Sequence, residues 1–295
     1  MKKAFLQLHV AIFLAGFTAV FGRVITMNEA LLVWYRMLFS TIILLLFAIG
    51  RSNIKLLPAR EIFRLIGVGA LIAMHWIFFY GSIKYANISV ALVCLSAVGF
   101  FSSFLDPLIS RRRIDPAEVF LGLLVMVGIY LIFHFDDTYK IGILFGMISS
   151  FLAAVFPILN KHLVTKYDAN TITFYEIGGG WLILNFIVPF YLLFLPKTNL
   201  VPGWSDLFWL IVLSLFCTVI AFNLSVRSLI KISPFTVNLS YNLEPVYGIM
   251  MAFVIYQEHQ LLGFSFYAGI GIIFLTVIIQ TIRVWRTARI VPSVA

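Results

Sequence analysis

One carboxylate lies where it could do chemistry. Glu244 is near the middle of the apolar segment 235–256 and is followed directly by Pro245. An ionisable side chain inside an apolar segment is costly and by default indicates function. In a helix, Tyr241, Glu244 and Gly248 would share one face. Glu244 could alternately hold a proton and a cationic substrate group, or it could hydrogen-bond to a neighbouring helix and fix packing.

Two further charges lie inside apolar segments at matching positions. Arg36 ends the tripeptide Trp34-Tyr35-Arg36, and Glu176 ends the similar tripeptide Phe174-Tyr175-Glu176. One interpretation is a pair of gate or substrate charges that face a cavity. The other is a structural polar contact that stabilises each helix. The sequence does not choose between the two interpretations.

A histidine lies in the middle of another apolar segment, next to aromatic rings. His75 is followed directly by Trp76, and Tyr80 comes shortly after. An imidazole changes charge near neutral pH, which suits a proton relay, but a lone buried histidine also commonly hydrogen-bonds to a neighbour. The rings of Trp76, Tyr80 and Tyr241 could stack an aromatic substrate or hold a cation. With 30 phenylalanines in the chain, ordinary packing is the stronger explanation for such rings.

The elements that position these residues follow from the composition. Of the 295 residues, 62% are hydrophobic and 11% are charged, whereas a soluble domain has roughly 25% charged residues. This composition excludes a soluble enzyme, a disordered chain and a disulfide scaffold, and it indicates a protein embedded in lipid. Apolar segments of about 20 residues can cross a bilayer, and they must be helical because a helix satisfies its own backbone hydrogen bonds. Ten segments qualify: 4–22, 30–49, 62–83, 88–109, 117–135, 141–160, 171–195, 207–226, 235–256 and 262–282.

The basic residues predict how these helices are oriented. The chain has 21 Lys and Arg against 12 Asp and Glu, a formal net charge of +9. With the N-terminus in the cytoplasm, most basic residues lie on the cytoplasmic side. The exceptions are Arg23, Lys84, Lys140 and Lys197 on the opposite side and Arg36 within a span. This asymmetry predicts that both termini are cytoplasmic. It also accounts for the positive charge without a nucleic-acid partner.

The sequence carries no signature of a cofactor or metal site. Cys94 and Cys217 each lie inside an apolar segment, and no spacing of Cys and His suits zinc. A GxxxxGK[ST] phosphate loop is missing from the sequence, so we expect no ATPase. Asp136-Asp137 is the most metal-like pair, with only His134 nearby. We therefore expect no cofactor and no metal.

The two halves of the chain resemble each other. Residues 83–92 align with residues 230–239, and weaker matches elsewhere follow in the same order. The first five spans therefore repeat as the second five, which divides the chain into residues 1–135 and 136–295. Because five is odd, the second repeat enters the membrane from the opposite side. Inverted repeats are typical of secondary transporters, since two related halves can exchange conformations.

The repeated segments also resemble a known family. Ser82–Val98 and Ser228–Val246, which contains Leu243-Glu244-Pro245-Val246, are similar to the drug/metabolite transporter (DMT) superfamily, specifically EamA-type permeases with two tandem EamA repeats. The resemblance implies a central cavity lined mainly by helices 1, 3, 4, 6, 8 and 9. It also implies export or exchange of small metabolites such as amino acids. The first repeat has Ser96-Ala97 where the family often has a polar residue and proline, so we expect the kink of the fourth helix at Asp106-Pro107.

These observations predict an all-α integral membrane protein with ten transmembrane helices in two inverted five-helix repeats. We interpret it as a secondary transporter that exports small polar or amphipathic metabolites by alternating access, with proton coupling left open. An integral-membrane enzyme and a channel-like facilitator are the alternatives. The expected partners are a small-molecule substrate, the lipid bilayer and, if transport is coupled, protons. We expect a monomer or a homodimer. The predicted location is the bacterial cytoplasmic (inner) membrane. The candidate substrate-binding or coupling residues are Glu244, Tyr241, His75, Arg36, Glu176, Tyr80 and Trp76.

Overall fold

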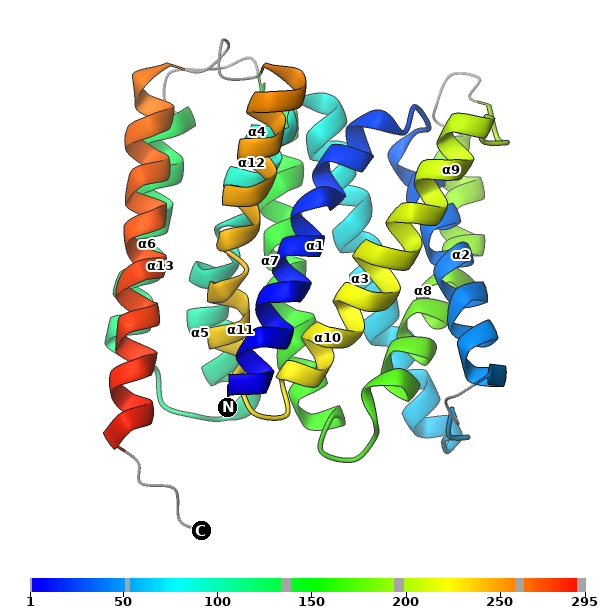
Figure 1. Ribbon diagram of the computed structural model, residues 1–295, viewed down its shortest axis with the longest axis horizontal. Helices are drawn as coiled ribbons and strands as arrows, with labels where there is room; N and C mark the ends of the chain where they lie inside the picture. The colour runs from blue at the N-terminus through cyan, green and yellow to red at the C-terminus, as the bar shows by residue number, and fades with distance from the viewer. Residues whose placement is uncertain (1, 51–53, 134–138, 194–198, 258–262, 291–295) are drawn as a thin grey trace.

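The computed structural model describes residues 2–50, 54–133, 139–193, 199–257 and 263–290, which form a bundle of helices (Figure 1). The helices are α1 (Lys2–Val24), α2 (Glu29–Gly50), α3 (Ala59–Tyr85), α4 (Ile88–Leu95), α5 (Val98–Ser110), α6 (Pro116–Phe133), α7 (Lys140–Leu163), α8 (Ala169–Leu192), α9 (Trp204–Val212), the π-helix η2 (Leu213–Ile220), α10 (Ala221–Ser228), α11 (Pro234–Ser240), α12 (Leu243–Tyr256) and α13 (Phe264–Ile290).

Seven helical segments in the described part of the chain are long and apolar enough to cross a membrane. They are α1, most of α2, α3, the joined α4 and α5, α7, α8, and the joined α9, η2 and α10. Shorter apolar stretches occupy α6 and α13. The ten-span count stays a prediction. The predicted repeat boundary after residue 135 and the pair Asp136-Asp137 lie outside the described residues.

Helix α3 lies in the core, packed against α7 and α8. Glycine permits the close approach of α3 to α8. A Cβ on Gly69 would overlap the Glu176 carbonyl oxygen and lie 2.7 Å from the Gly180 backbone nitrogen. A Cβ on Gly180 would lie 2.6 Å from the Gly69 carbonyl oxygen. Small residues allow backbones to meet in this way inside a membrane, where van der Waals packing replaces the hydrophobic drive to associate.

The fourth and ninth expected spans are each broken into two helices. Residues 96–97 separate α4 from α5, and residues 241–242 separate α11 from α12. Both broken spans end in a residue with φ of 53°, Arg111 after α5 and Gln257 after α12. In Figure 1, α4 and α12 lie at one end of the bundle while α5 and α11 lie at the other. The two broken spans therefore run in opposite directions, and they pack against each other along both halves.

The break in the fourth span corrects the predicted kink at Asp106-Pro107. Pro107 lies inside α5 without ending it, and the chain tightens instead at residues 96–97. The Ser96 amide bonds to the Val93 carbonyl at 3.1 Å, a 3₁₀-type contact. The Ser150 hydroxyl of α7 donates to the Cys94 carbonyl at 2.6 Å. The Ala97 amide bonds to the same carbonyl at 3.0 Å, so a neighbouring helix adds a second hydrogen bond at a break that contains no proline.

Candidate functional site

A cavity lies at the centre of the bundle, beside both breaks. It offers about 90 Å³ to water-sized molecules, enough for several waters. Its walls come from α1, α2, α3, α7, η2, α10, α11 and α12, together with Leu95 and Val98 on either side of the first break and Tyr241 in the second. The family resemblance implies a lining by the first, third, fourth, sixth, eighth and ninth predicted spans. All six of these spans contribute to the walls, and α2 adds to them. The ionisable or amide side chains in the lining are Arg36, His75, Cys217, Asn238, Tyr241 and Glu244.

Arg36 is the most elaborately held of these side chains, and its side chain is 1% exposed. Its Nε donates to Thr218 Oγ1 at 2.7 Å, and its Nη1 donates to the Tyr80 hydroxyl at 2.8 Å. Its Nη2 donates to the Cys217 carbonyl at 3.2 Å. The guanidinium carbon lies 3.6 Å from the centre of the Trp76 ring, a cation–π distance. Nη1 and Nη2 each carry a second N–H, which these hydrogen bonds do not use.

The π-helix η2 supplies part of this arrangement. In a π-turn the backbone bonds between residues i and i+5, and such turns often mark functional sites. A side chain makes a bond of the same spacing here, because the Thr218 hydroxyl donates to the Leu213 carbonyl at 3.4 Å. The Ser214 hydroxyl donates to the Arg36 carbonyl at 3.0 Å. Helix α2 and η2 are therefore joined through both the backbone and the side chain of Arg36. The wider turn presents the Cys217 carbonyl to the guanidinium.

Glu244 lies on another wall of the cavity, in the first turn of α12. Its side chain is buried, and Arg36 lines the same cavity. Pro245 fits the first helical turn because its missing N–H would have no intrahelical partner there. The amide end of a helix also favours a negative charge. The break before α12 thus places the carboxyl group at a helix N-terminus that faces the cavity.

His75 lines the cavity and is also tied to α7. Its Nδ1 lies 2.8 Å from the Ser149 hydroxyl and 3.0 Å from the Ser149 carbonyl. The Ser149 hydroxyl donates to the His75 carbonyl at 3.1 Å. The ring stacks on Phe79, with centroids 6.2 Å apart. Both alternatives from the sequence therefore have a basis, since the imidazole faces the cavity and bonds to a neighbouring helix.

The structure brings together most, but not all, of the residues singled out from the sequence. Arg36, His75, Trp76, Tyr241 and Glu244 all line the cavity. Tyr80 does not line the cavity, but its hydroxyl accepts a hydrogen bond from Arg36, which does. The side chain of Glu176 lies elsewhere, where it is fully buried and accepts a hydrogen bond from Asn160. Their roles in binding or coupling stay predictions.

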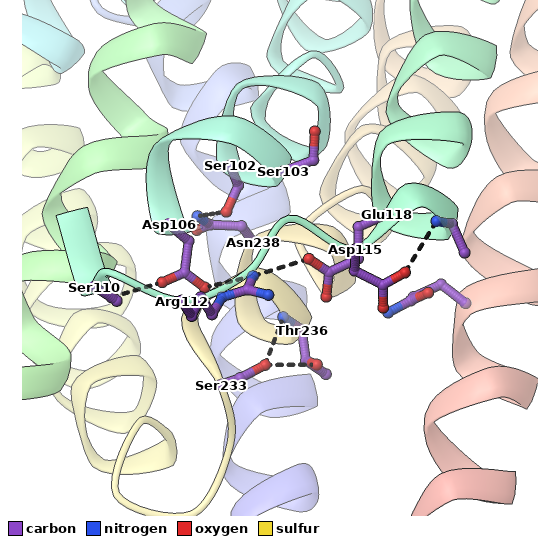
Figure 2. Close-up of polar contacts among 12 residues, drawn as sticks. Ser102, Ser103, Asp106, Ser110, Arg112, Asp115, Glu118, Ser233, Thr236 and Asn238 are labelled. Atoms are coloured by element: carbon purple, nitrogen blue, oxygen red, sulfur yellow. Dashed lines mark hydrogen bonds and ion pairs between the residues drawn. The ribbon is translucent and has the colours of Figure 1, made fainter. Parts of the chain in front are cut away.

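Sequence reasoning missed several lining residues, of which Asn238 is the most polar. Its amide donates to Ser102 Oγ at 3.1 Å and to the Ala154 carbonyl at 3.3 Å (Figure 2). An amide inside an apolar span was the available signal, since such groups are rare and need partners. The apolar residues Phe156 and Phe222, with ring centroids 6.0 Å apart, gave no such signal.

An ion-pair network lies at the end of the bundle that holds the N-terminus of α1 and the C-terminus of α13, and none of its members lines the cavity (Figures 1 and 2). Asp106 accepts hydrogen bonds from Ser110 at 2.9 Å and from Arg112 at 3.0 Å. Arg112 also donates to Glu118 of α6 at 2.8 Å. Asp106 therefore joins the end of α5 to the next loop, which agrees with a structural contact rather than a cavity charge.

A bundle of apolar helices around a buried cavity with charged walls is typical of membrane transporters. The chain belongs to the EamA-like transporter family, whose pattern matches residues 2–134 and again residues 140–282. It is therefore an integral membrane protein with two tandem EamA repeats, of the DMT type.

The fold has a counterpart among solved structures. A protein chain of known crystal structure superposes on this chain with a TM-score of 0.72. The match covers 97% of this chain and 99% of the other. The two sequences are 16% identical, so this likeness shows the fold alone. The comparison with curated proteins gives no match.

Proposed function

We propose that this transporter is a secondary carrier that exports small amphipathic solutes with one positive and one negative charge, such as amino acids. The observation that carries the proposal is the presence of two opposite charges, Arg36 and Glu244, in one cavity. A dipolar solute that leaves water must find a partner for each of its charges, because an unpaired buried charge is costly. A carboxylate would take the second N–H groups of Arg36, and an ammonium group would take the Glu244 carboxylate.

The apolar part of the lining supports an amphipathic rather than a wholly polar solute. Phe79 and Phe156 flank His75, and Phe222 adjoins Phe156. Ligand sites commonly combine such apolar walls with a few polar groups that fix orientation. A solute with one apolar side chain would therefore place that side chain against the phenylalanines.

Alternating access between two inverted repeats is the mechanism we propose. The opposite directions of the two broken spans support it (Figure 1), as does the tandem family match. Discontinuous helices near the midplane are common at transporter sites, where helix ends face the substrate. Here Leu95 and Val98 of the first broken span and Tyr241 and Glu244 of the second line the same cavity. Rocking of one repeat against the other would open the cavity first to one side and then to the other.

Orientation, direction and coupling complete the proposal. The N-terminus of α1 and the C-terminus of α13 lie at the same end of the bundle (Figure 1). We propose that this end faces the cytoplasm of a bacterial cell, and the excess of basic residues predicted on that side supports the proposal. Glu244 would release a proton when it binds an ammonium group and regain it when the solute leaves. The exchange of a proton for the solute would then drive export.

Counterflow in proteoliposomes tests this proposal. Vesicles loaded with an unlabelled neutral amino acid should take up the labelled compound from outside in a saturable way. Glu244→Gln should reduce this uptake to the level of protein-free vesicles, because the amide leaves the ammonium group without the charge partner that it needs on leaving water. Ser103→Ala is the matched control, since the Ser103 hydroxyl donates to the Phe100 carbonyl at 2.8 Å and does not line the cavity.

Two outcomes would contradict the proposal. Wild-type uptake rates in Glu244→Gln across a range of pH would remove Glu244 from the mechanism. Unitary currents, or chemical conversion of the solute, would identify a channel or an enzyme instead of a carrier.

A further inference from the structure

A second buried carboxyl group lies outside the cavity, near the end of the bundle where α7 and α8 are joined. Glu176 is in the second turn of α8 and its side chain is 0% exposed. Its Oε2 accepts a hydrogen bond from the Asn160 amide at 3.2 Å. Asn160 is in the last turn of α7 and is 1% exposed. Neither residue lines the cavity.

Three oxygen atoms in this region have no hydrogen-bond partner among the described residues. They are Oε1 of Glu176, Oδ1 of Asn160 and Oγ1 of Thr173. Thr173 is fully buried, and it precedes Glu176 by three residues, which places both on one face of α8. An unpaired buried acceptor costs about 1–3 kcal/mol. Three unpaired oxygens on and beside one carboxyl group therefore call for a hydrogen-bond donor or a positive charge at this place.

The charged groups on the surrounding helices do not supply that charge. Helices α2, α3 and α10 pack against α8, and α7 contributes Asn160. Most of their ionisable groups are bonded elsewhere: Glu29 to Tyr191, Arg36 to Thr218, Glu61 to Arg64, His75 to Ser149, Lys84 to the Ile25 carbonyl, Lys161 to the Leu229 carbonyl and Arg227 to Asn170. The remaining ones, Arg60, Lys140 and His162, are exposed.

We propose that Glu176, Asn160 and Thr173 form a site for one monovalent cation, either sodium or a proton, separate from the cavity. One carboxylate offers one negative charge, so a divalent ion would leave a net buried charge. Carboxylate, amide and hydroxyl oxygens are ligands for hard cations rather than for soft ones. A proton on Oε1 would meet the same need, because it turns an unpaired acceptor into a donor.

The position of the site connects it to transport through α3, and this connection rests on the proposed function. Glu176 lies where the backbones of α3 and α8 touch, with its own carbonyl against Gly69. Helix α3 also carries His75 and Trp76 of the cavity wall. A cation bound at Glu176 would therefore act on a helix that contacts the transported solute. Cation binding itself does not depend on which solute is carried.

Thermal unfolding of the purified full-length protein in detergent tests the site directly. One arm replaces choline chloride by sodium chloride at constant ionic strength and pH. The other arm lowers the pH in sodium-free buffer. A cation that binds only the folded protein should raise the melting temperature by about 5 °C at a hundred times its dissociation constant. A response to sodium identifies a sodium site, and a response only to pH identifies a protonation site.

Three variants make the test specific. Glu176→Gln should fold, because its amide can donate to the neighbouring acceptors, and it should lose the response. Thr173→Val keeps the carboxyl group and should shift the sodium concentration or pH at half-maximal stabilisation. Thr276→Val is the matched control: its hydroxyl is buried but donates to the Ile273 carbonyl at 2.6 Å, so its response should equal that of the wild type.

The proposal is overturned if the wild type responds to neither cation, or if Glu176→Gln responds as fully as the wild type. Should Glu176→Gln fail to fold, an unchanged midpoint in Thr173→Val would overturn it and a shifted midpoint would support it. No transported solute enters this assay. A negative result would therefore leave the carrier proposal intact, and failure of counterflow would leave the cation site intact.

Discussion

The contact between α3 and α8 can be tested with a pair of alanine substitutions in one helix. At Gly69, a Cβ would overlap the Glu176 carbonyl oxygen and lie 2.7 Å from the Gly180 backbone nitrogen. At Gly67, two residues earlier, a Cβ would meet nothing within 4 Å. Both glycines lie inside the same helix, so the two substitutions change helix propensity equally. They differ in whether the new methyl group meets α8.

The expected magnitude follows from that difference. Replacing glycine by alanine inside a helix gains up to about 1 kcal/mol of propensity at either position. Overpacking costs typically about 1–3 kcal/mol, and the upper end applies at Gly69 because the overlapping atoms belong to backbone and cannot rotate away. Gly67→Ala should therefore be neutral or slightly stabilising, whereas Gly69→Ala should lose about 2 kcal/mol net. The two variants should differ by about 3 kcal/mol.

Thermal unfolding of both variants in the same detergent checks this prediction. A difference of about 3 kcal/mol corresponds to a difference in melting temperature of about 6 °C or more. The measurement should be made in sodium-free buffer, so that cation binding beside Gly69 does not enter the comparison. Equal melting temperatures for Gly67→Ala and Gly69→Ala would refute the close approach of α3 to α8.

Two more substitutions test other contacts. Arg36→Lys keeps the charge but loses the planar set of donors, so we expect a loss of stability of about 2–4 kcal/mol together with loss of counterflow; unchanged melting temperature and uptake would contradict the structure. Partial burial raises the pKa of Asp115, but hydrogen bonds from Arg283 and from the Ala117 amide outweigh it and leave that pKa below its ordinary value. A lowered pKa stabilises the folded protein above the ordinary value of about 4 and not at lower pH. Asp115→Asn should therefore destabilise by about 1 kcal/mol at pH 7, and a difference from the wild type that does not shrink as the pH is lowered from 7 through the acidic range would contradict this assignment.

Charge inside an apolar segment was the feature that sequence reasoning used best. Arg36 and Glu244 are visible in the sequence because their types are rare in such segments, and the structure places both in one cavity. Glu176 has the same kind of signal but lies outside that cavity. Residue type shows that a charged group is buried, but only the packing of helices decides what it faces. For the same reason the faces of α7 and α10 that carry Phe156 and Phe222 could not be chosen in advance.

The lengths of most helices follow from the apolar segments, but their interruptions do not. At the break at residues 96–97, the Cys94 carbonyl accepts a hydrogen bond from the Ser150 hydroxyl, which comes from a different helix. The π-helix η2 lies inside the predicted span 207–226, a segment that contains neither glycine nor proline. The contact that uses the π-turn is the bond from Arg36 to the Cys217 carbonyl, which joins residues far apart in the chain. Local sequence cannot report an interaction whose partner is so distant.

The origin of the two cavity charges bears on the kind of solute the carrier would accept. Arg36 lies in the first family match and Glu244 in the second, so each repeat contributes one charge. If the repeats rock against each other, the distance between the guanidinium and the carboxyl group changes. A solute with a single charge pairs with the charge of one repeat, so its charge pairing does not depend on that distance. A solute with one positive and one negative charge pairs with both repeats and prefers the arrangement whose spacing matches its own. Charge pairing thereby couples the binding of such a solute to the conformational change, which is the physical reason to favour an amino acid over a simple cation or anion.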